Sequence, residues 1–197
     1  MNNQNLFPIF FCEFYNEEFC LFLQFIFLLI METAYFASGC FWGTEYHFLR
    51  AEGVIATTVG FMGGDVDNPT YEEVYTDKTG HVEVVKVEFD TERVSYDELV
   101  RLFFETHDFT QTDGQGPDIG TRYRSVLFVV DEAQSVTASK YIEILSQKGY
   151  EVATKIEHAS TFYPAEEYHQ QYYDKRDGSP YCHIYRKVFG DKLINSL

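Results

Sequence analysis

The chain has 197 residues, which is enough for one domain with a sizeable hydrophobic core. Hydrophobic residues make up 45% of the sequence and charged residues 23%, the usage of an ordinary globular protein, which argues against disorder. The formal net charge of −16 argues against a nucleic-acid partner or an anionic membrane surface, because such partners are bound mainly through Lys and Arg.

The cysteine usage indicates thiol chemistry rather than structural cross-links. Cys12, Cys20, Cys40 and Cys182 are too few and too scattered for a disulfide-stapled secreted fold or a structural zinc site. The sequence also contains no phosphate-binding loop, no dinucleotide fingerprint and no His-x-x-x-His pair. We therefore expect a cytoplasmic protein, acting as a monomer, that uses a thiol without a metal or another cofactor.

Residues 1–31 differ in character from the rest of the chain. Phe19 to Met31 is an almost unbroken apolar run that is too short to span a bilayer comfortably. No Lys or Arg precedes it, whereas a signal peptide carries a basic N-terminal region. We expect residues 1–31 to be an extension outside the catalytic domain, with Met31 as a plausible true start, and residues 32–197 to form a single catalytic domain. An atypical membrane anchor is the alternative.

The first expected strand, residues 33–37, leads through Ser38 and Gly39 into Cys40 and a helix over 41–50. Gly39 permits a tight turn at little steric cost. Cys40 is therefore expected in the first turn of the helix, where unpaired backbone N–H groups favour an anion. We expect this position to lower the pKa of the thiol and to make Cys40 a nucleophile. The alternative is a small buried cysteine in an aromatic core.

Two further strands are expected over residues 54–62 and 81–89. In the second of them Glu83 shares a face with Val85 and Val87, because side chains alternate along a strand. A carboxyl group in such an apolar environment has a raised pKa and can donate a proton near pH 7. The alternative is that Glu83 lies at a frayed strand end and faces solvent.

The second half of the chain predicts alternating helices and strands. In order, the expected elements are a helix capped by Ser95 and Glu98, a polar loop over 109–122, a strand over 123–130, a helix capped by Asp131 and Gln134, a strand over 152–158 and a short helix over 166–175. A loop as long as 109–122 is uncommon unless it is functional. The order β-α-β-β-α-β, followed by α-β, favours an antiparallel-rich sheet with helices packed on it over a doubly wound parallel sheet.

Four more side chains are candidates for a site. Tyr71 and Tyr123 each stand where a loop meets a strand or turn, and their hydroxyls could orient a polar oxygen there, with simple packing as the alternative. Asp118 is either a turn residue or a binding residue. Cys182, in a tail segment bounded by Gly, Ser and Pro, could resolve an oxidised Cys40 as a disulfide. We expect the histidines to pack or to lie at the surface; they include His81, His107, His158, His169 and His183.

Five segments resemble the A-type peptide methionine sulfoxide reductases, in the family's order from about Thr33 to the C-terminus. The segments are Gly39-Cys40-Phe41-Trp42-Gly43, Pro69-Thr70-Tyr71-Glu72-Glu73-Val74, Thr79-Gly80-His81-Val82-Glu83, the run from Gln115 to Ser125, and Phe162-Tyr163 with the run from Glu166 to Tyr172. One such segment is a weak signal, and five in register are highly specific. The resemblance implies an α+β fold: a two-layer, ferredoxin-like sandwich with a mixed, mostly antiparallel sheet and a long irregular C-terminal tail.

The resemblance also implies a reaction. Cys40 would attack the sulfur of methionine-S-sulfoxide, free or in proteins, and Glu83 would protonate the sulfoxide oxygen, so that methionine leaves and Cys40 becomes a sulfenic acid. Cys182 would then form a disulfide with Cys40, which thioredoxin, or dithiothreitol in vitro, would reduce. Many family members have two cysteines in a glycine-rich tail, whereas here Cys182 is the only tail candidate. Cys12 and Cys20 are alternative resolving thiols.

By the same resemblance, Phe41 and Trp42 would form the apolar wall that holds the methyl group of the substrate. Tyr71 and Tyr123 would hydrogen-bond the sulfoxide oxygen or the acid, and Asp118 would hold the substrate near its backbone amide. Proton transfer to oxygen and a soft nucleophile at sulfur are what sulfoxide reduction needs.

Two other functions fit a reactive cysteine. A cysteine acyl hydrolase or transferase would pair Cys40 with a histidine, such as His81 or His169, within hydrogen-bonding distance. A redox sensor or binding module would only switch a disulfide at Cys40, without turning over a sulfoxide.

Overall fold

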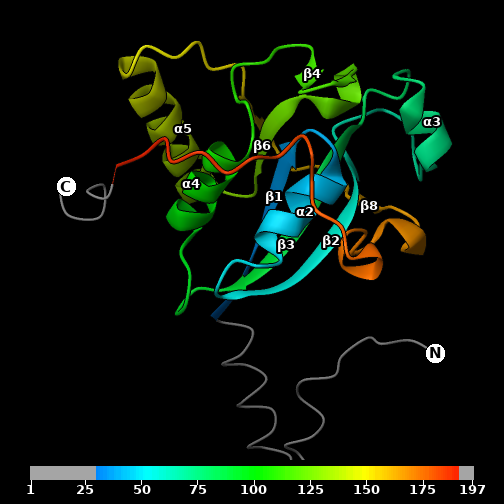
Figure 1. Ribbon diagram of the computed structural model, residues 1–197, viewed down its shortest axis with the longest axis horizontal. Helices are drawn as coiled ribbons and strands as arrows, with labels where there is room; N and C mark the ends of the chain where they lie inside the picture. The colour runs from blue at the N-terminus through cyan, green and yellow to red at the C-terminus, as the bar shows by residue number, and fades with distance from the viewer. Residues whose placement is uncertain (1–29, 191–197) are drawn as a thin grey trace, which may run out of the picture.

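A six-stranded sheet organises the protein, and the ribbon of Figure 1 shows helices packed on it. The computed structural model describes residues 30–190. The strands of this sheet are β1 (Met31–Ser38), β2 (Val54–Met62), β3 (Val82–Asp90), β6 (Ser125–Val129), β7 (Lys155–His158) and β8 (Tyr163–Pro164). The helices are α2 (Phe41–Phe48), α3 (Tyr71–Tyr75), α4 (Tyr96–Thr106) and α5 (Glu132–Gln147). Smaller elements are the hairpin of β4 (Gly114–Gln115) and β5 (Asp118–Ile119) and the 3-10 turns η2 (Thr121–Tyr123), η3 (Glu167–His169) and η4 (Asp174–Arg176).

The strand order is β7-β6-β1-β3-β2-β8. Apart from the short elements α3, β4, β5 and η2, the chain order β1-α2-β2-β3-α4-β6 produces its four central strands, which pair antiparallel throughout. At the edges, β7 pairs parallel with β6 and β8 pairs antiparallel with β2. The ferredoxin-like, mostly antiparallel α+β fold is therefore confirmed.

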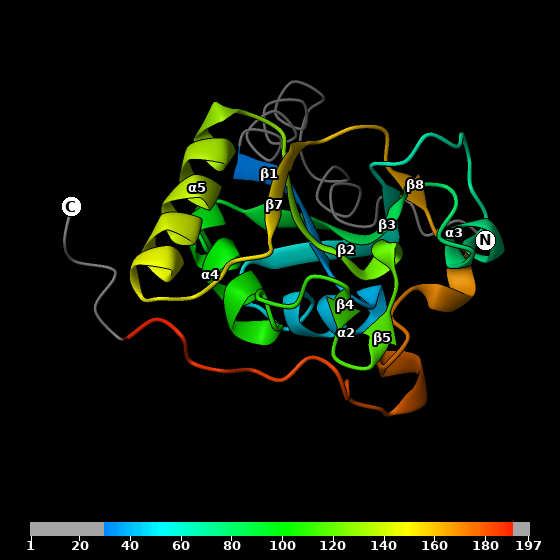
Figure 2. The same cartoon turned by 90° about the horizontal axis from the view of Figure 1, so that it is seen from above.

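The two faces of the sheet are packed differently. Figure 2 shows α2 and α4 on one side of the sheet, where the main core lies. Along β3, Val85 and Val87 belong to this core, whereas Val82 and Val84 belong to a smaller cluster on the other face. The alternation expected for this strand is thus present, and it turns Glu83 toward the helix-covered face.

The two helix caps expected from the sequence are present. The Ser95 hydroxyl accepts from the Glu98 backbone N–H, and the Glu98 carboxylate accepts in return from the Ser95 N–H, which completes a capping box at α4. The Asp131 carboxylate accepts from the Gln134 N–H at the start of α5. Both helices begin where local hydrogen bonding predicts.

Several segments differ from the expectation. The long loop over 109–122 contains the β4–β5 hairpin and the start of η2, and β8 follows the strand that was expected to be the last. The helix expected over 166–175 is wrong, because the segment forms only the two turns η3 and η4. Gln171, between them, has a φ of 51° in the left-handed region, which a continuous helix cannot contain.

The proposed N-terminal extension lies outside the described residues apart from Ile30 and Met31. Met31 is the first residue of β1 and pairs with Asp90, so this strand begins two residues before the expected one. Over residues 30–190, no helix combines the length and the apolar character that crossing a membrane requires.

Candidate active site

The turn between β1 and α2 places Cys40 at the N-cap of the helix. Gly39 has a φ of 96°, and a Cβ there would lie 2.4 Å from Cβ of Gln115, so the turn requires glycine on two counts. Cys40 itself stands one residue before the first turn of α2, with its carbonyl accepting from the N–H groups of Gly43 and Thr44. The side chain is partly buried and the thiol is free.

The expected lowering of the Cys40 pKa is wrong. Burial raises the pKa of this thiol well above its ordinary value, and a negative charge on Glu83 raises it further. The helix start acts in the expected direction, since a backbone hydrogen bond from Trp42 lowers the pKa, but this effect is smaller than desolvation. Cys40 is therefore a protonated thiol in the reduced protein, and its reaction must include the transfer of that proton.

Glu83 lies on β3 beside Cys40, and only 2% of its surface is exposed, so the alternative of a solvent-facing carboxylate is wrong. Its Oε2 atom accepts a hydrogen bond of 2.9 Å from the backbone N–H of Phe41, the residue that follows Cys40. Burial raises the pKa of Glu83 to about 8. The carboxyl is thus neutral near pH 7. Because Oε2 accepts from Phe41, the proton belongs on Oε1.

Tyr71, the first residue of α3, and Tyr123, the last residue of η2, complete the polar part of the site. Burial raises the pKa of both phenols, and negative charges on Glu83 and Cys40 raise it further. The two phenols therefore lie close enough to the carboxyl and the thiol to respond to charges on them. Both phenols remain protonated at neutral pH and can donate hydrogen bonds into the site.

An arginine fixes the position of Tyr123. The Arg122 guanidinium lies 4.3 Å from the centre of the Tyr123 ring and also stacks on Tyr75 at 4.4 Å. Asp77 also holds the guanidinium, with an ion pair of 2.8 Å. Its positive charge lowers the pKa of Glu83, against the larger effect of burial.

Trp42 forms an aromatic wall with two residues from the distant segment after β8. The Trp42 indole N–H donates to Nδ1 of His169 at 3.2 Å, and the Tyr172 ring stacks on the indole with 3.6 Å between the ring centres. Phe41 lies behind this wall, packed on His169 and Tyr71 and 1% exposed. Trp42 is only partly buried, so it offers the accessible apolar surface, with Phe41 as support.

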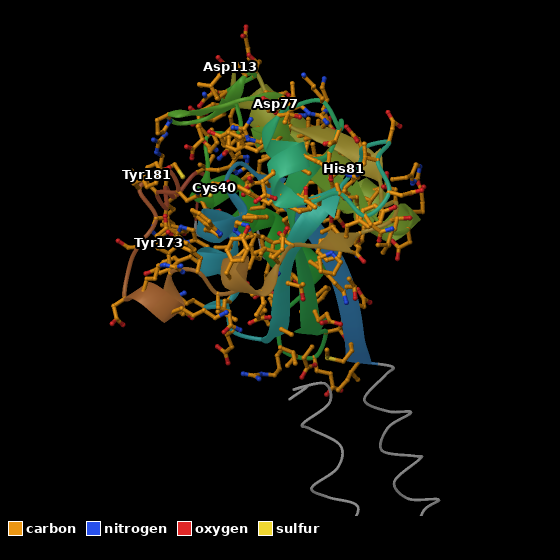
Figure 3. The ribbon with its side chains drawn as sticks, turned by 90° about the vertical axis from the view of Figure 1, so that its right-hand side faces the viewer. Cys40, Asp77, His81, Asp113, Tyr173 and Tyr181 are labelled. Carbon is orange, nitrogen blue, oxygen red and sulfur yellow. The ribbon has the colours of Figure 1, made fainter. Side chains whose placement is uncertain are left out.

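The C-terminal tail brings Cys182 and its neighbours to the same place. Tyr181 donates from its hydroxyl to the Asp118 carboxylate at 3.0 Å, and negative charges on Cys182 and Asp118 raise the pKa of Cys40. Figure 3 shows Cys40, Tyr173 and Tyr181 on one side of the molecule, in agreement with the electrostatic effect of Cys40 on both tyrosines. All the site residues expected from the sequence are thus gathered around one thiol; they are Cys40, Phe41, Trp42, Tyr71, Glu83, Asp118, Tyr123 and Cys182.

Several residues that shape this site were not predicted from the sequence in the positions that they occupy. His169 and Tyr172 hold Trp42, Arg122 holds Tyr123, and Gln115 packs against Gly39. All four stand in segments that resemble the reductase family, which was the only signal that could have identified them. Over residues 30–190, no three His, Cys, Asp or Glu side chains are grouped so that they could hold a metal ion.

The histidines proposed as partners of Cys40 in an acyl hydrolase have other partners. His81 is bound by Gly64 N–H at 3.1 Å and by the Val66 carbonyl at 2.8 Å, and Figure 3 shows it apart from Cys40. His169 accepts from Trp42 through Nδ1. Within the described part of the chain, neither imidazole hydrogen-bonds the Cys40 sulfur. The thiol-imidazole pair that acyl transfer needs is not formed by these residues.

Comparisons with known proteins agree on one family. The family model described as peptide methionine sulfoxide reductase matches residues 32–196. A peptide methionine sulfoxide reductase MsrA from Methanoculleus marisnigri is 52% identical over 151 residues, covering 75% of this chain and 92% of its own. The reduced form of Mxr1 from Saccharomyces cerevisiae superposes with a TM-score of 0.76 at 34% identity, covering 80% of this chain and 93% of its own. The structure of Mxr1 in complex with Trx2 superposes with a TM-score of 0.55 at 28% identity, covering 80% and 91%. The family model covers most of the chain, and the site holds a thiol, a protonated carboxyl and an aromatic wall. The protein therefore belongs to the peptide methionine sulfoxide reductase family.

Proposed function

We propose that the protein reduces methionine-S-sulfoxide to methionine, with Cys40 as the nucleophile, Glu83 as the acid and thioredoxin as the final reductant. The observation that carries this assignment is the buried carboxyl of Glu83, neutral near pH 7 and held beside Cys40 by the Phe41 N–H. A neutral carboxyl can give a proton to the sulfoxide oxygen, which an ionised one cannot.

The first step is balanced without an external acid. Glu83 donates its proton from Oε1 to the sulfoxide oxygen while the Cys40 sulfur bonds to the sulfoxide sulfur. The thiol proton of Cys40 passes to the Glu83 carboxylate, which becomes a neutral carboxyl again. The hydroxyl group then moves from the substrate sulfur to the Cys40 sulfur: the substrate S–O bond and the transient S–S bond break, methionine leaves and Cys40 becomes a sulfenic acid. Because Glu83 receives the thiol proton, the raised pKa of Cys40 is compatible with the reaction.

The surrounding residues bind the substrate. Tyr71 and Tyr123 are protonated and lie beside Glu83, which supports a role in hydrogen-bonding the sulfoxide oxygen. The indole of Trp42, held by Tyr172, is suited to the methyl group that an apolar surface would attract. Asp118 would accept from a backbone amide of the substrate in place of the Tyr181 hydroxyl, and its present acceptance of that hydroxyl supports such a role.

The sulfenic acid on Cys40 is resolved by Cys182 and the disulfide is reduced by thioredoxin. The position of Cys182 supports the first part, because a negative charge on Cys182 would raise the pKa of Cys40 and because His183, the next residue, packs against Gly39 beside Cys40. The complex of the structural relative Mxr1 with Trx2 supports the second. Free and protein-bound methionine sulfoxide are both substrates in this proposal, and the protein acts as a cytoplasmic monomer whose catalytic domain is residues 32–197, in keeping with a family match that begins at residue 32.

A single-turnover assay tests the assignment. Reduced protein is mixed with an equal amount of dabsyl-methionine-S-sulfoxide without another reductant, and methionine formation and dimedone-trapped sulfenic acid are measured together. Wild type and Cys182→Ser should both release one equivalent of methionine, with the sulfenic acid persisting on Cys40 in Cys182→Ser. Cys40→Ser should release none. Full release by Cys40→Ser would overturn the mechanism, and turnover of the R epimer at an equal rate would overturn the proposed substrate.

With thioredoxin as reductant, Cys182→Ser should lose multiple turnover, whereas dithiothreitol should support it because a small dithiol can reduce the sulfenic acid directly. Equal activity with both reductants would remove the resolving role of Cys182 and leave the role of Cys40 unaffected.

A further inference from the structure

His183, the residue after Cys182, is buried against the turn that carries Cys40. Only 3% of its surface is exposed, and its ring fills space left by two glycines. A Cβ on Gly43 would lie 2.2 Å from Nδ1 of His183, and a Cβ on Gly39 would lie 3.6 Å from its Cε1. The histidine thereby fixes the tail, and with it Cys182, beside Cys40.

The hydrogen bonds of the ring determine which nitrogen carries the proton. His183 Nε2 lies 2.7 Å from the backbone carbonyl of Ser38, and a carbonyl oxygen only accepts, so Nε2 must donate. In a neutral imidazole the other nitrogen, Nδ1, is then an acceptor. The Cys182 sulfur lies 3.1 Å from Nδ1, so the thiol donates to it.

We propose that His183 is the general base that takes the thiol proton of Cys182 when Cys182 attacks the oxidised Cys40. The proposal rests on the proposed function, because it concerns the resolving step of that reaction. The Ser38 carbonyl orients the imidazole as the carboxylate does in a catalytic triad. Ser38 ends the strand that leads into Cys40, so one short segment positions both the nucleophile and the base for the second step.

The step balances with the groups present. The Cys182 sulfur bonds to the Cys40 sulfur, and the S–O bond of the sulfenic acid breaks. The thiol proton moves to His183 Nδ1 and then to the departing hydroxide, which leaves as water. An electron pair of the Cys182 sulfur forms the S–S bond, and the S–O bonding pair leaves with the hydroxide. The Cys40 sulfur is thereby reduced and the Cys182 sulfur oxidised by one unit each, so no further oxidant or reductant takes part until thioredoxin reduces the disulfide.

The tail environment explains why Cys182 needs a base. Burial and the neighbouring Asp118 raise the pKa of the Cys182 thiol to about 12, so few molecules hold a free thiolate at neutral pH. Burial also lowers the pKa of His183 to about 3, helped by His107 and His47, so its Nδ1 is unprotonated over the physiological range. Because burial disfavours a separate thiolate and a separate imidazolium, the proton moves from Cys182 to His183 as the S–S bond forms. The attraction between the two developing charges offsets part of the desolvation cost.

Asp118 is the competing acceptor, because its carboxylate can also hydrogen-bond the Cys182 thiol. Asp118 already accepts the Tyr181 hydroxyl at both oxygens, at 3.0 and 3.2 Å. Other ionisable groups also couple to Cys182 or His183; they are Glu83, Cys40, Tyr173 and Tyr181 around Cys182, and His47 and His107 around His183. Among all these groups and His183 itself, the imidazole nitrogen in contact with the Cys182 sulfur is His183 Nδ1.

The test compares two variants of His183 in single turnover with methionine sulfoxide and no reductant. His183→Gln keeps an N–H donor for the Ser38 carbonyl but has no basic nitrogen, and His183→Ala loses both. Methionine release, dimedone-labelled Cys40 and disulfide formation are followed in the same samples by quenched flow and mass spectrometry. Methionine release shows in each sample that the protein is folded and that the proposed first step operates.

We expect His183→Gln to release methionine as wild type does but to form the disulfide about 100-fold more slowly, so that the sulfenic acid accumulates. Its disulfide rate should rise about tenfold per pH unit between pH 6 and 9, as attack by a freely ionising thiol does, whereas the wild-type rate should stay nearly flat.

Three results would overturn the proposal. Disulfide formation in His183→Gln at the wild-type rate, with a slow rate only in His183→Ala, would make His183 a tail anchor. A slow rate in Asp118→Asn with a normal rate in His183→Gln would make Asp118 the base. Loss of methionine release in His183→Gln would place the histidine in the first step instead. Absence of methionine release from wild type is a different failure, that of the proposed function.

Discussion

Replacing Glu83 with glutamine tests whether the buried carboxyl is the proton donor. Glu83 is 2% exposed with a pKa raised to about 8 by burial, so roughly nine in ten molecules hold the proton at pH 7 and roughly one in ten at pH 9. Glutamine fills the same space and can accept from the Phe41 N–H, but it has no acidic proton. General acid catalysis contributes about 10²–10⁴-fold to a rate, and we expect the rate of methionine formation to fall by an amount in this range.

Single-turnover methionine formation measured from pH 6 to pH 10 provides the assay. The wild-type rate should decline about tenfold per pH unit above pH 8, and the rate of Glu83→Gln should lack this decline. A variant that keeps more than about a third of the wild-type rate would refute the assignment, since that is far less than a general acid contributes. A wild-type rate that climbs steadily through pH 9 would refute it as well, because ionisation of Cys40 would then limit the reaction.

Glu83→Gln should lower the rate of methionine formation, but it should also make the stability of the folded protein less dependent on pH. The folded protein binds the Glu83 proton more tightly than the unfolded chain, because burial raises the pKa from 4.5 to about 8. Its stabilisation is therefore complete below pH 4.5 and declines as the pH rises to 8, by up to roughly 5 kcal/mol. Between pH 5 and 8, Tm of Glu83→Gln should fall less than that of wild type, by on the order of 10 °C in calorimetry. Equal falls would show that Glu83 is not buried as described.

Three further predictions concern the wall and the tail. Trp42→Ala removes the indole that stacks on Tyr172 with 3.6 Å between the ring centres. KM for the sulfoxide should rise about tenfold in steady-state kinetics, because roughly 1.4 kcal/mol of apolar contact is lost. An unchanged KM would contradict the methyl-binding role. Gly43→Ala places a Cβ 2.2 Å from Nδ1 of His183. This overpacking should lower the free energy of unfolding, measured with denaturant, by about 1–3 kcal/mol. In the control Gly190→Ala the new Cβ meets nothing within 4 Å, so the free energy of unfolding should not change. Glu105→Ala removes the buried carboxylate that accepts from Tyr185, Val188 and Phe189 in the tail, so we expect a loss of about 3 kcal/mol and faster proteolysis of the tail. The matched variant of the exposed Glu92 should show neither effect, and a tail that stays resistant in Glu105→Ala would show that other contacts hold it.

Local signals in the sequence determined most of the fold. The strand over 54–62 has the expected bounds because β-branched residues and flanking glycines favour a strand with few competing alternatives. The helices after Ser95 and Asp131 begin where their caps predict, since a capping hydrogen bond joins residues three apart. The helix predicted over 166–175 is absent because no capping side chain begins it. Its residues make tertiary contacts instead: Tyr172 stacks on Trp42, and the Gln171 N–H donates to Glu45 of α2.

The sequence by itself predicted the family and the main side chains of the proposed chemistry, because five motifs in a fixed order contain most of them. It could not determine the protonation of Cys40, since a helix start and burial act on the thiol in opposite directions and only the folded surroundings show that burial is the larger effect. It could not establish that Glu83 is buried either, because a residue near the start of a strand can lie at a frayed end that faces solvent. The wall of Trp42 and the contact of His183 with Ser38 join residues more than a hundred positions apart, and only the tertiary structure decides such neighbours.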